Sequence, residues 1–216
     1  MSCAICEVRK EKRFCPGVHG RICPTCCGTE REFTVECPSD CPYLLQARAH
    51  EKPRSLDHVD RSALFPNVEI PEKFLYDNEH LLVGLSFALA RAARADRSIN
   101  DRDLIAAISS LARSYDTLVN SGLVYEAPIT NVVHQAIAAE VQKMITEYRQ
   151  LEQKQFGYSM LKDSDVLRAL VFLLRMAESR TSGRPKSRAY IDLLFTQFPD
   201  KPGVVTPEES SRLIVP

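Results

Sequence analysis

The sequence has no cysteine beyond residue 41, no surplus of charge and no long apolar run. Its 28 Lys and Arg side chains are balanced by 28 Asp and Glu side chains, so no overall field draws the chain to nucleic acid or to a membrane surface. No apolar run approaches the roughly 18 residues that a membrane-spanning helix needs. No apolar signal segment precedes the first cysteine, so we expect a cytoplasmic protein.

Familiar catalytic motifs are also missing. The sequence has neither a Gly-rich phosphate-binding loop nor a Gly-x-Ser-x-Gly nucleophile elbow. Asp77 and His80 would share one helix face, but a di-metal site in a helical bundle needs a matching Glu-x-x-His. Asn131 takes the acidic position ahead of His134. We therefore expect that the chain is not an enzyme.

All eight cysteines fall within the first 41 residues, in a pattern typical of zinc ligands. Two C-x-x-C pairs form knuckles whose sulfurs converge on one ion, at about 2.3 Å from it. Eight thiolates suffice for two tetrahedral zinc sites, both structural because no coordination position stays open for water. A disulfide framework is the alternative, but it is typical of secreted domains. The predicted metal ligands are Cys3, Cys6, Cys15, Cys23, Cys26, Cys27, Cys37 and Cys41.

The assignment of sulfurs to the two ions follows an interleaved scheme. Cys3 and Cys6 join Cys23 and Cys26 on one ion, and the other four cysteines hold the second. The adjacent Cys26 and Cys27 would point in different directions and so serve different ions. His19 follows Cys15 at a legitimate ligand spacing and is the alternative to Cys27.

This pattern resembles the double-zinc, interleaved modules of the RING, MYND and HIT-finger type. It is also similar to an amino-terminal cysteine module of uncharacterised bacterial proteins. Both likenesses cover residues 1–50 only. The first implies a compact fold that binds protein or nucleic acid, and the second implies no known activity. The adjacent cysteine pair departs from the RING pattern, so ubiquitin-type activity is not carried over.

The charge of residues 1–41 favours a protein partner. Six basic and six acidic side chains cancel there, and eight thiolates with two Zn²⁺ ions leave the region at about −4. A nucleic-acid-binding finger depends instead on a surplus of Lys and Arg. We therefore predict a non-enzymatic zinc-binding adaptor.

Two basic clusters keep a nucleic-acid-binding regulator open as the alternative. The first lies at residues 9–13. The second, at residues 175–188, surrounds the connection between the last two predicted helices, where a helix amino terminus also attracts anions. A solvated charged loop is the other interpretation of the second cluster. The side chains are Arg9, Lys10, Lys12 and Arg13 in the first cluster and Arg175, Arg180, Arg184, Lys186 and Arg188 in the second.

Beyond residue 71 the apolar residues recur at helical spacing, which predicts an all-α, five-helix bundle. The predicted helices cover about 72–95, 101–121, 128–156, 164–179 and 187–198. Most sides of the fourth are apolar, so it should be the central one. The predicted domains are a cysteine module at 1–50, a linker at 51–71 that lies along the bundle, a helical domain at 72–199 and a loosely held tail at 200–216.

Overall fold

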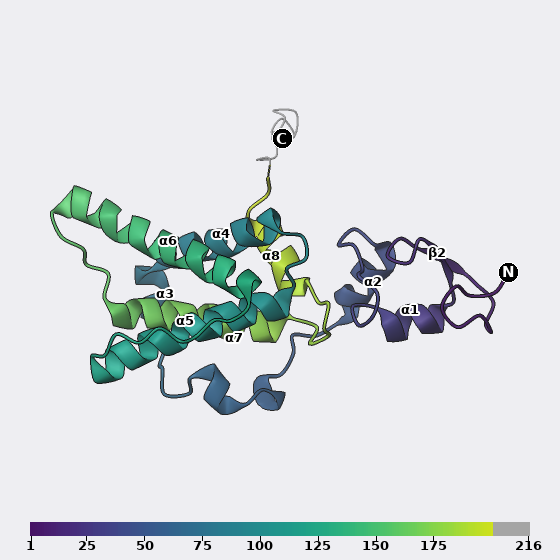
Figure 1. Cartoon of the computed structure of the whole chain (residues 1–216), viewed down its shortest axis with the longest axis horizontal. Coiled ribbons are helices and arrows are strands. Elements are labelled where there is room, and N and C mark those ends of the chain that lie inside the picture. The colour runs from purple at the N-terminus through teal and green to yellow at the C-terminus, as the bar shows by residue number, and fades with distance from the viewer. Residues whose placement is uncertain (201–216) are drawn as a thin grey trace, which may run out of the picture.

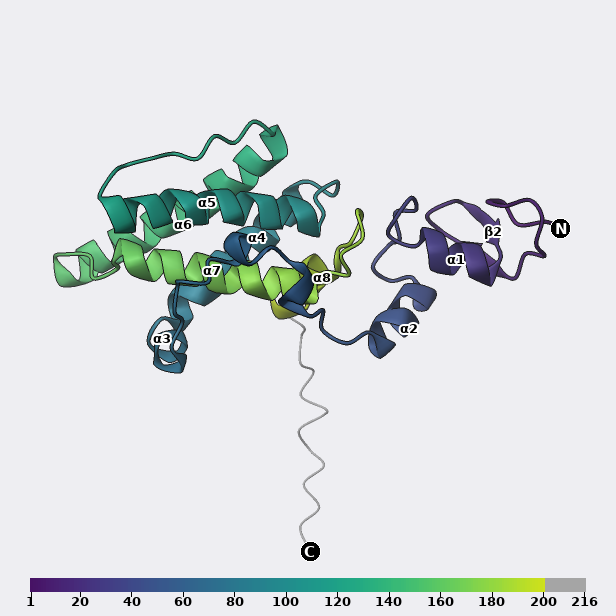
Figure 2. The same ribbon diagram turned by 90° about the horizontal axis from the view of Figure 1, so that it is seen from below.

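The computed structural model describes residues 1–200, apart from the side chain of His58. Residues 1–50, here the cysteine block, form a small lobe at one end of an elongated molecule (Figure 1). Residues 72–199, the helical block, form the larger lobe at the other end, and a quarter turn of the molecule shows the same separation (Figure 2). The predicted loose tail lies, from residue 201 on, outside the described residues.

The cysteine block contains a short sheet as well as helices, so the chain is mostly helical and not all-α. Strands β1 and β2 pair antiparallel, with Phe14 opposite Arg21. Three-residue strands are too short to show an alternating pattern in the sequence, which is why the prediction missed them. The elements are β1 (Arg13–Cys15), β2 (Gly20–Ile22), α1 (Pro24–Glu30) and α2 (Pro42–His50).

The segment between the blocks runs along the helical block, as predicted. It contains two 3₁₀ turns, η1 (Leu56–His58) and η2 (Arg61–Leu64), and both pack against α7 (Asp163–Arg180). Arg175 on α7 donates hydrogen bonds to the carbonyl oxygens of Leu64, Phe65 and Val68 at 2.7–3.0 Å. The Arg175 side chain therefore ties the segment to the bundle.

Six helices make up the helical block, where the sequence predicted five. The first predicted helix is divided at Asn78, whose side-chain amide donates to the carbonyl oxygen of Phe74 at 3.1 Å. Asparagine competes in this way with backbone hydrogen bonds and is a poor residue inside a helix. The helices are α3 (Glu72–Asp77), α4 (Glu79–Ala95), α5 (Asp101–Ser121), α6 (Val132–Phe156), α7 and α8 (Ala189–Gln197).

Local capping explains where the long helices begin and end. Asn100 forms a capping box with Asp103 at the start of α5, and Gly122 ends the helix in the left-handed region at φ 69°. The third predicted helix starts four residues later than expected. Asn131 accepts a hydrogen bond from the backbone N–H of Val133 at 2.8 Å and so fixes the start of α6.

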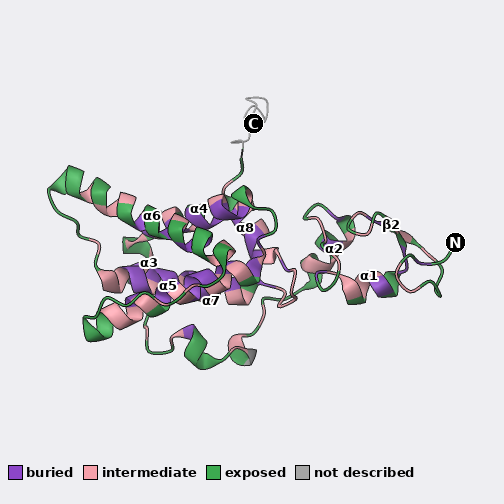
Figure 3. Cartoon of the chain, in the orientation of Figure 1, coloured by how far each residue is buried: buried purple, intermediate pink, exposed green. Residues whose placement is uncertain are grey.

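The core of the helical block surrounds α7, which packs mainly against α5 and also contacts α4 and α8. Figure 3 shows buried residues concentrated where α5 and α7 lie together. Eight residues of α7 are buried, which confirms the prediction of a central fourth helix. None of the helices in residues 1–200 is long and apolar enough to cross a membrane.

Candidate metal centre

Four cysteines converge in the cysteine block as the interleaved scheme predicts. The Sγ atoms of Cys3, Cys6, Cys23 and Cys26 all lie within 4.8 Å of one another. We call these residues the first thiol set. Tetrahedral zinc with Zn–S bonds of about 2.3 Å places its sulfurs about 3.8 Å apart. The first thiol set therefore fits one zinc ion with only small adjustments.

Local backbone structure brings these four sulfurs together. Cys23 is the N-cap of α1, followed by Pro24 at the first helical position, and its Sγ accepts a hydrogen bond from the backbone N–H of Cys26 at 3.4 Å. Cys3 also accepts, from the backbone N–H of Cys23 at 3.2 Å. Glu7, at φ 55°, turns the chain directly after Cys6. The helix start and the tight turn each present one C-x-x-C pair.

The electrostatics of the first thiol set call for a cation. The backbone N–H of Cys26 lowers the pKa of Cys23. Burial raises the pKa of Cys3, but hydrogen bonds from Cys6, Cys23 and Ile5 outweigh it, so the pKa of Cys3 falls. Burial and the neighbouring sulfurs raise the pKa of Cys26. Not all four thiols can ionise side by side without a positive charge, and Zn²⁺ supplies two.

Arg9 supplies part of that positive charge. Interaction with the Cys23 thiol, together with the charges of Cys23, Cys6 and Cys26, raises the pKa of Arg9. The sequence analysis placed Arg9 in a basic cluster for nucleic acid. In the structure the Arg9 side chain is exposed, and it lies near enough to the first thiol set for these thiols to act on its pKa. Its position inside the cysteine pattern, three residues after Cys6, was the available signal.

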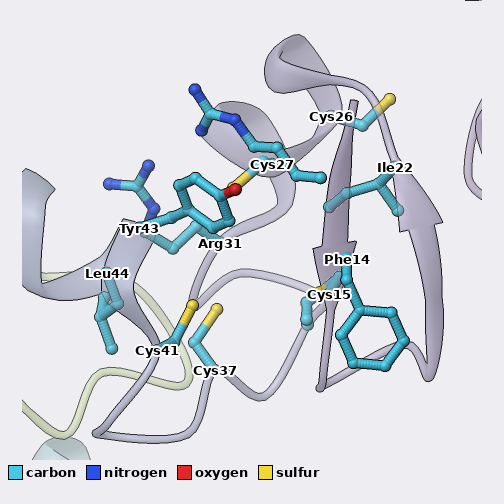
Figure 4. A pocket seen from close by; sticks show the side chains of 12 residues that line it. Phe14, Cys15, Ile22, Cys26, Cys27, Arg31, Cys37, Cys41, Tyr43 and Leu44 are labelled. Carbon is cyan, nitrogen blue, oxygen red and sulfur yellow. The ribbon is translucent and has the colours of Figure 1, made fainter. Parts of the chain in front are cut away.

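The other four cysteines line one small cavity and form the second thiol set: Cys15, Cys27, Cys37 and Cys41. The cavity holds about 20 Å³, and Figure 4 shows the sulfurs of Cys37 and Cys41 side by side. The sulfur of Cys26 points away from them, so the adjacent Cys26 and Cys27 do face different directions. Among the described residues, no three Sγ atoms of this set lie as close together as those of the first. The set is gathered, but it is looser than the first.

The second thiol set is supported by three different elements of the block and the loop that carries Cys37. Cys15 ends β1, Cys27 lies on α1, and Cys41 is the N-cap of α2. Cys15 and Cys41 are buried, whereas Cys27 and Cys37 are partly exposed. Burial raises the pKa of Cys37. His19 is exposed in the turn between β1 and β2 and does not line the cavity, so the geometry gives no support to His19 in place of Cys27.

The second basic cluster is largely engaged inside the molecule. Arg184 donates to the carbonyl oxygens of Gly28 (3.1 Å) and Arg31 in the cysteine block. Lys186 donates from its Nζ to the carbonyl oxygen of Thr34 at 2.8 Å. Arg188 donates to the carbonyl oxygens that precede α5. The solvated-loop interpretation is therefore wrong for these three side chains, because they dock the two blocks together or brace α5.

The remaining candidate groups lie apart from the thiols. Asp77 and His80 are both exposed, on either side of the break between α3 and α4. His134 lies 3.0 Å from Asp103, where it links α6 to the start of α5. No protein-family model, curated protein or solved structure matches this chain. The thiol geometry is thus the main guide to function.

Proposed function

We propose that the chain is a non-enzymatic, cytoplasmic adaptor whose cysteine block is folded around two structural zinc ions. The observation that carries the proposal is the convergence of the four Sγ atoms of the first thiol set within 4.8 Å. Four thiolates complete a tetrahedral zinc site and leave no position for a reactive water. The ion at this set serves the fold and performs no catalysis.

The second ion belongs to the second thiol set. Its four thiols face one cavity, and thiolates are the soft ligands that zinc favours. Together the two sets give the interleaved arrangement of the RING, MYND and HIT-finger type. The block then corresponds to a metal-folded domain at 1–50, joined by the segment at 51–71 to a separate helical domain at 72–199.

A protein partner is supported by exposed apolar side chains around the end of α6. Four large apolar side chains within ten residues are each about half exposed or more: Leu151, Phe156, Tyr158 and Met160. Clustered exposed apolar residues are typical of protein–protein contacts. We prefer this reading to nucleic-acid binding because Arg184, Lys186 and Arg188 already have hydrogen-bond partners within the chain.

Cobalt substitution and partner capture test the proposal. Co²⁺ should bind with the charge-transfer bands of tetrahedral thiolate sites, and the bands should saturate at about two ions per chain. Crosslinking in a cell extract should capture a protein with the full chain. The Phe156→Ser/Tyr158→Ser variant should lose that protein, and the control Val132→Ser, at an exposed site on the other end of α6, should keep it. Binding to nucleic acid that weakens steeply with salt, without protein capture, would favour the alternative.

A further inference from the structure

The cysteine and helical blocks are held together by a compact group of polar contacts. From the α7–α8 connection (181–188), Arg184 donates to the carbonyl oxygen of Gly28 at 3.1 Å. The backbone N–H of Lys186 donates to the carbonyl oxygen of Glu32 at 2.8 Å. Both acceptors are backbone atoms, so the contacts depend on how the cysteine-block backbone is folded.

Arg48 on α2 pairs with two carboxylates, Glu32 within the cysteine block and Asp192 on α8, and only the pair with Asp192 joins the two blocks. Its Nη2 lies 2.7 Å from Glu32 Oε1, and its Nη1 pairs with Asp192 on α8. Ser39 donates to the other oxygen of Asp192 at 2.6 Å. Glu32 is almost fully buried, at 2% exposed. A buried carboxylate needs its cation in place, so Arg48 must stay positioned for the blocks to remain docked.

All but one of these docking contacts use cysteine-block residues that lie between two cysteines of the second thiol set. Gly28, Arg31, Glu32 and Thr34 lie between Cys27 and Cys37, and Ser39 lies between Cys37 and Cys41. Arg48 lies on α2, the helix that Cys41 caps. Among residues 1–200, the hydrogen bonds and ion pairs between the two blocks use residues 28–48 of the cysteine block, all of which follow the last cysteine of the first thiol set. Gly28 also lies on α1, the helix that Cys23 caps and that carries Cys26. Figure 1 likewise shows the amino terminus on the far side of the cysteine block.

The two sets also differ in how closely the spacing of their sulfurs matches that of a tetrahedral zinc site. The first set already lies within 4.8 Å, whereas no three members of the second do among the described residues. An ion bound by the second set must draw its sulfurs to about 3.8 Å from one another. That contraction moves or rigidifies the backbone to which Arg184 and Lys186 bind, and it sets the position of α2 and therefore of Arg48.

We infer that the second thiol set is a zinc-responsive latch: zinc binding there and docking of the two blocks stabilise each other, while the first set holds its zinc independently of docking. This inference rests on the second zinc ion of the proposed function. Loss of that ion releases the cysteine block while the first site and the helices stay intact. Thermodynamic linkage requires the reverse effect as well, so undocking must weaken zinc binding at the second set.

The reverse effect gives the sharper experiment, because the variants keep all eight thiols. The full chain carrying Arg48→Ala/Arg184→Ala is loaded with zinc and titrated with a chromophoric chelator that competes for it. We expect the weaker of two zinc affinities to fall by about 5- to 150-fold, the usual range of coupling between sites. The tighter affinity should not change. The control Arg149→Ala, which breaks an ion pair with Asp163 far from the interface, should change neither affinity.

The forward effect is measured with Cys37→Ser and its matched control Cys6→Ser. Small-angle X-ray scattering should show a larger radius of gyration for Cys37→Ser, and proteolysis should speed up at 51–55, with helical circular dichroism retained. Cys6→Ser should leave the scattering profile closer to that of the wild-type chain.

Two kinds of failure are distinguishable. A wild-type chain that binds a single zinc ion refutes the second site and with it the proposed function. A chain that binds two ions, with both affinities unchanged in Arg48→Ala/Arg184→Ala, overturns the latch alone.

Discussion

Replacement of Asp101 by asparagine tests the buried hydrogen bonds that join the start of α5 to the start of α8. Asp101 is 0% exposed at the start of α5. Its Oδ2 accepts from Ser187 Oγ at 2.7 Å and from the N–H of Tyr190 at 3.3 Å, and its Oδ1 accepts from the N–H of Ile191 at 3.2 Å. One carboxylate thus satisfies the buried hydrogen-bond donors at the start of α8.

Asparagine keeps only one oxygen, so one of these buried donors must face an amide N–H₂. Leaving a buried polar group unsatisfied costs about 1–3 kcal/mol. We expect Asp101→Asn to lower the free energy of unfolding by about that amount, and Asp101→Ala to lower it further. Asp116→Asn on the same helix is the control, because that carboxylate is more exposed and its substitution should stay within about 0.5 kcal/mol.

The cost of Asp101→Asn should also depend on pH. Burial raises the pKa of Asp101, although hydrogen bonds from Ser187, Ile191 and Tyr190 lower it in part. A carboxyl group with a raised pKa in the folded state stabilises that state when protonated. This contribution is full below the unfolded value near about 3.9 and is lost as pH rises through the folded value. The difference in stability between wild type and Asp101→Asn should therefore widen toward acid pH.

Urea unfolding followed by circular dichroism, at several pH values and a fixed zinc concentration, measures both effects. The cysteine block contributes equally to the two proteins, so the difference between them isolates Asp101. An Asp101→Asn variant as stable as wild type, or a gap that widens toward alkaline pH, would refute the reasoning.

Three further substitutions have definite expected outcomes. The hydroxyl of Tyr190 is buried without a hydrogen-bond partner among the described residues. Tyr190→Phe should therefore leave the free energy of unfolding unchanged or raise it by up to about 2 kcal/mol. A lower free energy of unfolding, measured in urea, would contradict this. A Cβ at Gly17 would meet the carbonyl oxygen of Glu36 and lie 2.7 Å from Val35 Cγ1. Gly17→Ala should therefore speed the loss of zinc to a chelator while the helical circular dichroism signal is kept. An unchanged rate of zinc release would count against the packing described. Arg175→Met keeps the apolar stem but loses three hydrogen bonds to the 51–71 segment. The free energy of unfolding should therefore fall by about 1–3 kcal/mol, and proteolysis at 56–70 should accelerate. Equal digestion rates would show that Arg175 does not hold the segment.

Features set by local sequence were the ones that could be predicted. The bounds of α5 follow from a cap at Asn100 and a stop at Gly122, both next to the residues they control. The first thiol set follows from two C-x-x-C pairs in the same way. The break at Asn78 was missed because the apolar spacing of a single long helix continues across it.

Contacts between segments that are distant in the chain could not be predicted from the sequence. Arg184 binds carbonyl oxygens about 150 positions earlier in the chain. A backbone acceptor leaves no signature in side-chain composition, so nothing in the sequence marks Gly28 or Arg31 as the partner. A basic side chain such as Arg184 next to a helix start equally suggests a site for a free anion. Only the fold shows that carbonyl oxygens of the cysteine block bind this side chain instead.

The zinc content of single cysteine variants tests the account most directly. Native mass spectrometry of the full chain should find two zinc ions in the wild type, and one in each of Cys6→Ser and Cys37→Ser, because each variant opens one of the two thiol sets. The unsubstituted set should keep its ion in each case. A wild-type chain with one ion, or with disulfide bonds among Cys15, Cys27, Cys37 and Cys41, would contradict the two-site account.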